Sequence, residues 1–378
     1  MAYTNIDDPS AYFSATIYTG DGSADQSMTG AGFKPDFLWI KRRNASERHV
    51  LTNVAMGVSD GAYKWLDSAD THAEFSGGTG VASFDSDGFT IKSSDATWNT
   101  SGSTYVFWSW KANGGTTTSK SSATVSGNVT TPCVQQVNTT SGISILTYTA
   151  STSYAGTETH LEHGLGVGPK VLIVKRRDTT ANWAVYHAEN GGSPNAGYSY
   201  NLLNSTAATA QSSPTNKYWL NTPAESNATL LAFGSGDDTG ADGGEYVCYA
   251  FAEKKGYSKF GSYFGNASAD GPFVFTGFKP AWVLVKNSVH SGWDWAIMDN
   301  KRTPTNANGT YEWSWANLDA AEFTDGDSGI NMEIDFLSNG FKIRTARDEL
   351  NRNGDKFIYM CFAESPFVTS TGIPTTAR

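Results

Sequence analysis

One pattern occurs three times along this chain, and it limits the fold more than any other feature of the sequence. In each copy a proline is followed six residues later by a lysine, and a short hydrophobic run lies between them. β-Branched and aromatic residues dominate these runs, so we expect strands that are buried on both faces. A pattern that recurs in this way indicates tandem copies of one structural unit. The proline–lysine pairs are Pro35 and Lys41, Pro169 and Lys175, and Pro280 and Lys286.

Other features recur around each pair. A strand led by a tyrosine precedes it, at Tyr18, Tyr148 and Tyr263. After the first and third pairs come Phe84-Asp-Ser-Asp-Gly-Phe89 and Phe336-Leu-Ser-Asn-Gly-Phe341. Asp-Gly and Asn-Gly between apolar runs predict tight hairpins, because these residues tolerate a positive φ.

The repeats predict an all-β fold with almost no helix. We expect three tandem antiparallel β-sandwiches, of jelly-roll or concanavalin-like type. The predicted boundaries are 1–112 for the first unit with an N-terminal segment, 113–142 for a Thr/Ser-rich linker or an extra strand, 143–256 for the second unit, and 257–378 for the third unit with a C-terminal tail. Because only residues 254–256 join the last two units, we expect these to pack together and the first to sit apart.

Composition excludes several classes of protein. The net charge of −10 argues against nucleic-acid binding, which needs concentrated Lys and Arg. No apolar run approaches the ~20 residues of a membrane span, so we expect no membrane insertion. No charged n-region followed by an apolar h-region is found, so we expect no signal peptide. Cys133, Cys248 and Cys361 are too sparse for a disulfide framework and are interpreted as buried apolar side chains.

The sequence offers little for catalysis, and we expect neither an enzyme nor a cofactor. Glu333 and Asp335 would share one strand face, as in some jelly-roll glycoside hydrolases, but Leu337 and Ser338 stand where a second glutamate would be needed. No Gly-x-Ser-x-Gly elbow, phosphate loop or dinucleotide fingerprint occurs.

Metal ligation has a few candidates. Asp237, Asp238 and Asp242 form an acidic stretch that could hold a surface Ca²⁺, although a solvated loop is the alternative. Asp85-x-Asp87-Gly88 resembles the opening of a calcium loop but lacks the later ligands, so a turn is favoured. His160 and His163 could chelate a metal only within a helical turn, and they precede a strand.

Two further groups suggest surface contacts. Lys41-Arg-Arg43 and Lys175-Arg-Arg177 follow the same strand in two copies, whereas the third has Lys286-Asn-Ser. This recurrence favours structural pairing with acids over binding of an anionic glycan or a phosphate. The chain has 49 aromatic residues, and most recur at strand positions as core residues. Four aromatic residues lie off the repeat. They are candidate glycan contacts, and the alternative is that they cap the sandwich ends or fill unit–unit contacts: Tyr218, Trp219, Trp293 and Trp315.

Several longer strings of the sequence carry a family resemblance. They span 5–13, 32–41, 84–89, 246–263, 269–280, 334–343 and 362–368. These strings resemble a family of marine bacteriophage virion proteins that carry a repeated domain of unknown function. The resemblance covers nearly the whole chain and implies a lectin-like β-sandwich, but it brings no catalytic residues.

The resemblance favours a non-enzymatic virion surface protein, made in the bacterial host cytoplasm without a signal peptide. The leading hypothesis is a tail-fibre or head-fibre component that contacts host-surface glycan. The first alternative is a capsid decoration or cement protein, and the second is a free lectin-like or polysaccharide-active module. The expected partners are other virion proteins and further copies of the chain, with a homotrimer among the options.

Overall fold

The computed structural model describes residues 3–151, 158–190, 199–212, 218–220, 228–304, 306, 311–326 and 331–375. Strands make up 46% of the chain and helices 4%, which confirms the predicted all-β class. The only α-helix in these ranges is the short α3 (Asp348–Asn351). No helix within them is long and apolar enough to cross a membrane.

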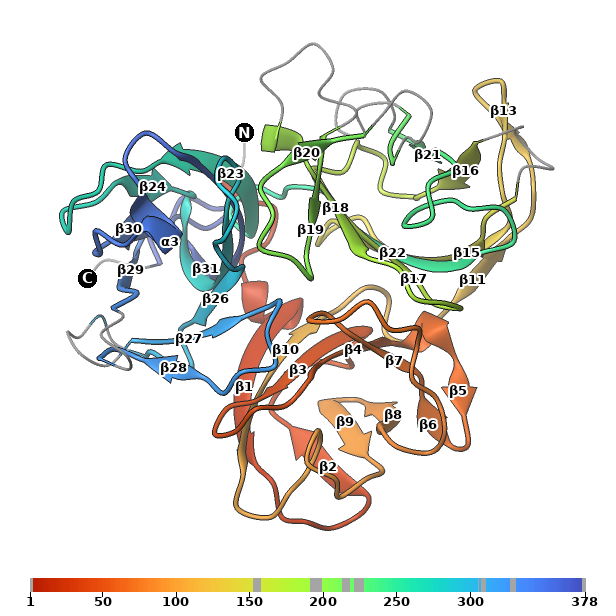
Figure 1. Ribbon diagram of the computed structural model, residues 1–378, viewed down its shortest axis with the longest axis horizontal. Coiled ribbons are helices and arrows are strands. Elements are labelled where there is room, and N and C mark those ends of the chain that lie inside the picture. The colour runs from red at the N-terminus through yellow and green to blue at the C-terminus, as the bar shows by residue number, and fades with distance from the viewer. Residues whose placement is uncertain are drawn as a thin grey trace.

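The strands form three large antiparallel sheets and several small ones, and each sheet takes its strands from one of three segments of the chain. We call residues 13–110 the first segment, 118–251 the second and 258–366 the third. In Figure 1 the large sheets face one another around the middle of the molecule, and the small sheets lie on the outside.

Sheet I belongs to the first segment and has five strands, with a three-stranded sheet and a two-stranded hairpin beside it. Sheet I has the order β1 (Phe13–Thr19), β10 (Thr104–Trp110), β3 (Phe37–Arg42), β4 (His49–Asn53) and β7 (Trp65–Asp67). The small sheet has the order β2 (Gln26–Thr29), β9 (Gly88–Ile91) and β8 (Val81–Asp85), and the hairpin joins β5 (Val58–Ser59) and β6 (Ala62–Tyr63). Two 3₁₀ turns accompany them, η1 (Pro9–Ala11) and η2 (Val54–Met56).

Sheet II belongs to the second segment and has eight strands. Its order is β11 (Thr118–Lys120), β14 (Cys133–Asn138), β15 (Ile143–Thr149), β22 (Glu245–Phe251), β17 (Val171–Arg176), β18 (Trp183–His187), β19 (Ser199–Leu202) and β20 (Ala210–Gln211). Beside it lie the pair β16 (Thr159–Glu162) and β21 (Leu230–Phe233), the hairpin β12 (Thr124–Val125) and β13 (Asn128–Val129), and the turn η3 (Ala188–Asn190). The stretch 113–142 therefore supplies two strands of sheet II, β11 and β14.

Sheet III belongs to the third segment and has six strands. Its order is β23 (Ser258–Phe264), β31 (Lys356–Pro366), β25 (Phe278–Asn287), β26 (Ala296–Asp299), β27 (Glu312–Trp315) and β28 (Phe323–Thr324). Its small sheet has the order β24 (Phe273–Phe275), β30 (Gly340–Ile343) and β29 (Ile334–Leu337).

The registers of the three large sheets correspond residue by residue. In each, the strand after the proline pairs with the closing strand of its segment, in the pairs Trp39 with Trp108, Ile173 with Tyr249, and Leu284 with Met360. Because these pairs occupy the same place in their sheets, other positions can be matched by counting along the strands. We use "corresponding" below in this sense.

In each large sheet the strand after the proline is buried on both faces, as predicted. Along β3, Leu38 and Ile40 pack toward the small sheet of their own segment. Their neighbours Phe37 and Trp39 point the other way, into a cluster that also contains Ile173 of the second segment. Successive side chains of a strand alternate between its faces, so one strand contributes to two cores.

The second of these cores is shared by all three segments. Its centre is Trp282, whose ring lies 5.7–6.4 Å from rings of both the first and third segments. Those rings belong to Phe13, Trp39, Trp108, Trp110 and Phe362. The second segment adds Ile145, Trp183 and Tyr249. The expectation that the first unit sits apart is therefore wrong, because the linker length does not reveal a hydrophobic face on sheet I that must be covered.

The two predicted hairpins form, and a second constraint besides the turn favours glycine after each turn. Gly88 begins β9 and Gly340 begins β30, each directly after the turn. A Cβ on Gly88 would lie 1.9 Å from the Met28 carbonyl oxygen, and one on Gly340 would lie 2.1 Å from the Val274 carbonyl oxygen. Only Gly88 has a positive φ, at 149°. The close approach of the neighbouring strand is therefore the constraint that both positions share.

Candidate functional site

Three corresponding lysines join the segments into a closed ring. Lys41, Lys175 and Lys286 are fully buried, and the Nζ of each donates to a backbone carbonyl of another segment. The acceptors are Asp319 at 3.2 Å for Lys41, Thr71 at 3.2 Å for Lys175, and Thr206 at 3.0 Å for Lys286. The first segment thus bonds the third, the second bonds the first, and the third bonds the second.

The same three carbonyls also accept a backbone N–H from the segment that supplies the lysine. The donors are Glu47 to Asp319 at 2.7 Å, Ala181 to Thr71 at 2.9 Å, and Gly292 to Thr206 at 2.9 Å. Each lysine makes a further bond to a carbonyl of its own segment, that of Arg42, Arg176 or Trp293. Burial lowers the pKa of each of the three lysines to about 8.

The arginines that follow the first two lysines pair with acids across the same junctions. Arg43 donates from Nη2 to Glu322 at 2.8 Å and to Glu312 at 3.1 Å. Arg177 donates from Nε to Glu74 at 2.8 Å. These contacts support the structural interpretation of the two basic triplets. At the third junction Ser288 stands at the position of the arginines, and its carbonyl accepts the Thr209 N–H at 3.0 Å.

We expect Glu74→Ala to lower the free energy of unfolding by about 2 kcal/mol, because hydrogen bonds to charged groups contribute ~1.5–3 kcal/mol and Arg177 is mostly buried. Urea unfolding at pH 7 measures the loss. Glu245→Ala is the matched control, since it removes an exposed carboxylate near Arg177 and should change stability by less than ~0.5 kcal/mol. Equal losses in the two variants would contradict the role of this ion pair.

A second cyclic set of polar contacts lies near the shared core, at Asn53, His187 and Asp299. Asn53 Nδ2 donates to the Tyr249 hydroxyl at 2.9 Å, and Trp108 Nε1 donates to Asp299 at 3.0 Å. His187 Nε2 lies 3.0 Å from the Tyr359 carbonyl, which can only accept, so the proton is on Nε2. Burial lowers the pKa of His187 to about 4, and the ring is therefore neutral. Asn53, His187 and Asp299 thus each form a hydrogen bond to another segment, but the partner groups differ: a hydroxyl, a backbone carbonyl and an indole N–H.

Two of the four predicted aromatic contacts are not accessible. Trp219 is 0% exposed and packs against Tyr186 and Phe233, and Trp315 is 5% exposed in the core of the third segment. The prediction that these two rings contact glycan is wrong, because both are buried in hydrophobic cores and not exposed to solvent.

The other two predicted rings are half-buried. Tyr218 stacks on Tyr200 with 3.9 Å between the ring centroids, and its hydroxyl donates to Asp238 at 2.6 Å. Trp293 lies before β26. Both stay predictions as glycan contacts, since nothing in the structure tests them.

The predicted calcium ligands serve other contacts. Asp238 is 7% exposed and accepts hydrogen bonds from Tyr218 and from the backbone and side chain of Asn182. Asp237 lies 3.7 Å from Arg176, and Asp242 is exposed. Within the described ranges no group of three or more His, Cys, Asp or Glu side chains could hold a metal ion.

The remaining candidates are also occupied locally. Asp335 accepts from the Tyr311 hydroxyl at 2.6 Å, and burial raises the pKa of Glu333. Asp87 accepts the backbone N–H groups of Gly30 and Gly32, so it ties the β8–β9 turn to the chain after β2. His160 lies in strand β16 beside Glu158, not in a helical turn.

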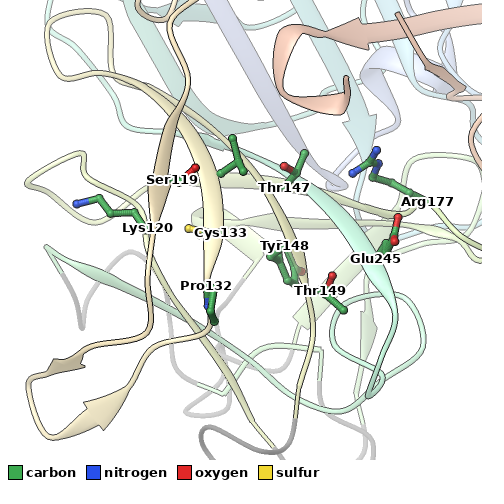
Figure 2. A pocket seen from close by; sticks show the side chains of 10 residues that line it. Ser119, Lys120, Pro132, Cys133, Thr147, Tyr148, Thr149, Arg177 and Glu245 are labelled. Atoms are coloured by element: carbon green, nitrogen blue, oxygen red, sulfur yellow. The ribbon is translucent and has the colours of Figure 1, made fainter. Parts of the chain in front are cut away.

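A shallow cavity of about 370 Å³ lies on sheet II beside the added strands β11 and β14. Figure 2 shows Arg177 and Glu245 at one end of it and Lys120 at the other. The Cys133 thiol is not an activated nucleophile, because burial raises its pKa to about 11. Thr147 and Thr149 offer hydroxyl groups, so the cavity can form hydrogen bonds.

A longer groove runs between strands β23 and β24. Two cavities form it, of about 480 and 430 Å³, and they share Glu253, Lys259 and Phe275. We call this the β23–β24 groove. Its exposed rings are Phe275 at 62%, Tyr3 at 59%, Phe273 at 46% and Phe367 at 38% exposure.

The fold does not require phenylalanine at these positions. Val274, between the two β24 phenylalanines, pairs with Phe341, just as Met28 pairs with Phe89 in the first segment. Phe273 and Phe275 therefore correspond to Ser27 and Thr29, which are exposed as well. Exposed rings are typical of a contact surface when the corresponding strand of another segment has hydroxyl residues at the same positions.

Sequence reasoning missed this groove, although the signal was present. The strand before Gly-Phe-Lys-Pro reads Phe273-Val-Phe275 in the third copy, whereas the first copy has Ser27-Met-Thr29. Comparing the copies for apolar residues at positions that alternate outward would have identified it.

Residues 8–366 match a family described as "Domain of unknown function (DUF7483)". The chain belongs to this family. The match runs through all three segments, so the family is defined over the whole ring and not over one copy. No curated protein gives a significant match, and no solved structure does either.

Proposed function

We propose that this chain is a non-enzymatic surface protein of a bacteriophage particle, built from three copies of one β-sandwich. The observation that carries the proposal is the ring of junctions around the shared core. Three large sheets covered by smaller ones, with corresponding registers and corresponding lysines, support three copies. The sequence resemblance to marine phage virion proteins supports the location.

The ring favours a compact block over a fibre shaft. The three large sheets close on one core within a single chain, so the ring needs no second copy to assemble. Tyr3 and Phe367 line the same cavity, so the segments that contain them lie on one face of the molecule. A compact block of this kind suits the head of a tail or head fibre. It also suits a capsid decoration protein, which is the alternative.

Locating the chain on purified phage particles tests this proposal. Particles are purified on a density gradient, labelled with an antibody against the chain and imaged by electron microscopy. We expect label on the particle surface, at fibre ends for a fibre component or over the capsid for a decoration protein. Particles that lack the chain, while the lysate contains it free, would contradict the proposal and favour a free lectin-like or polysaccharide-active module.

A further inference from the structure

Strand β23 is an open edge of sheet III. It pairs with β31 on one side, and among the described residues no strand pairs with its other side. Alternate residues of an edge strand direct their backbone groups outward. The Gly265 N–H bonds to Asp355 of the chain before β31, whereas the Phe260 N–H points outward to the Glu253 carboxylate at 3.5 Å. By this alternation, the backbone groups of Ser262 also face the groove.

The second segment shows how such an edge can be covered. Its strand β15 corresponds to β23, and β14 lies antiparallel against it, pairing Gln136 with Ile145 and Val134 with Thr147. Ile145 and Thr147 correspond to Phe260 and Ser262. Just before β14, the Thr131 N–H bonds to the His160 carbonyl of β16 at 2.7 Å. An extended strand thus fills, in the second segment, the position that is a groove in the third.

The first segment closes the same position differently. Ser14 and Thr16 on its edge strand β1 donate to the Gly30 carbonyl at 3.4 and 3.2 Å, which ties β1 to the chain after β2. The third segment has Lys259 and Gly261 at these positions. A Cβ on Gly261 would lie 2.6 Å from the Tyr359 hydroxyl oxygen, so the position favours glycine. The third segment therefore has no hydroxyl side chains at these two positions that could make the corresponding hydrogen bonds, and the groove lies at this place.

We infer that the β23–β24 groove accepts an extended segment of a partner polypeptide, which adds to sheet III as an antiparallel strand beside β23. Main-chain hydrogen bonds to Phe260 and Ser262 would supply affinity. A carbonyl of the partner strand would replace the Glu253 carboxylate as the acceptor of the Phe260 N–H. Phe273 and Phe275 would contact apolar side chains at every second residue of the partner. Lys259 and Glu253 border the groove, so polar residues suit the alternate positions.

This inference deepens the proposed function, which supplies only the source of the partner, a neighbouring virion protein. Random twelve-residue peptides displayed on filamentous phage are the probe. They are selected on the immobilised full chain, and enriched peptides are synthesised for fluorescence anisotropy and hydrogen exchange. This experiment uses the isolated chain and not the bacteriophage particle. The strand proposal and the proposed location on the particle can therefore fail separately.

Ser262→Pro is the decisive variant, because proline removes one outward N–H and is tolerated on an edge strand. We expect it to weaken peptide binding at least tenfold, and Phe275→Thr, which installs the residue of the first segment, to do the same. Ile17→Pro changes the corresponding position of β1 and controls for folding. Bound peptide should also slow exchange of the Phe260 and Ser262 amides.

Either of two results would overturn the inference. One is an absence of enriched peptides. The other is binding of enriched peptides to Ser262→Pro and Phe275→Thr as strongly as to the unaltered chain. If a glycan array gives ligands that Phe275→Thr loses while no peptide is enriched, the groove is a glycan site and the strand proposal is wrong.

Discussion

Trp282→Ala is expected to lower the free energy of unfolding by about 3–5 kcal/mol, the usual range for removing a buried tryptophan. Trp282 is 1% exposed and touches rings of both the first and third segments. The cavity left by the substitution would lie between sheets I and III. The loss should therefore appear in the first segment as well as in the third, where the substitution is made.

Hydrogen exchange measured by mass spectrometry separates the two segments. Peptides covering β3 and β10 should lose as much protection as those covering β25 and β31. Phe275→Thr is the control, because it removes an exposed ring from the same segment and should leave protection unchanged. A loss confined to residues 258–366 would show that the third segment folds independently, contrary to a shared core.

Lys175→Met is expected to remove a pH dependence of stability worth about 3 kcal/mol. Burial lowers the pKa of Lys175 from 10.5 to about 8, so the folded chain releases this proton at lower pH than the unfolded chain. Between pH 8 and 10.5 the unfolded state holds more protons, and stability due to this residue rises with pH. Methionine has a similar length and does not titrate.

The quantity to measure is the difference in unfolding free energy between the unaltered chain and Lys175→Met, from urea titrations at pH 7, 8, 9 and 10. Buried cysteines and tyrosines titrate in both proteins, and their contributions cancel in the difference. The difference should move in favour of the unaltered chain as pH rises. Lys301→Met, an exposed lysine, is the control. A constant difference across this range would contradict the burial of the ammonium group.

The local fold was predictable because strand signals are local. Hydrophobic runs after a proline and the Asp-Gly and Asn-Gly turns predict the class and the hairpins. The expectation that a tyrosine leads the preceding strand is wrong, because Tyr18, Tyr148 and Tyr263 lie next to the ends of β1, β15 and β23. The placement of the first segment was not predictable, because a run such as Phe37-Leu-Trp-Ile40 shows that both faces are buried but not what covers the second face. That information lies in the complementary surfaces of sheets II and III.

The functional surface was harder to predict than the fold. Trp219 and Trp315 are predicted glycan contacts on sequence grounds, yet both are buried. Neither ring is an exposed loop residue: Trp315 lies in strand β27, and Trp219 packs into the core of the second segment. The exposed rings Phe273 and Phe275 lie on the repeat itself, where alternation and comparison with Ser27 and Thr29 distinguish them. The junction lysines recur in all three copies, but their cyclic bonding depends on the packing of the segments.

The most direct test of the shared core is the urea dependence of hydrogen exchange in the unaltered chain. Peptides covering β3, β17 and β25 report on the first, second and third segments in one experiment. One cooperative ring predicts that all three lose protection with the same midpoint and the same dependence on urea. If one segment loses protection at clearly lower urea while the others stay protected, the three sheets do not share a single core.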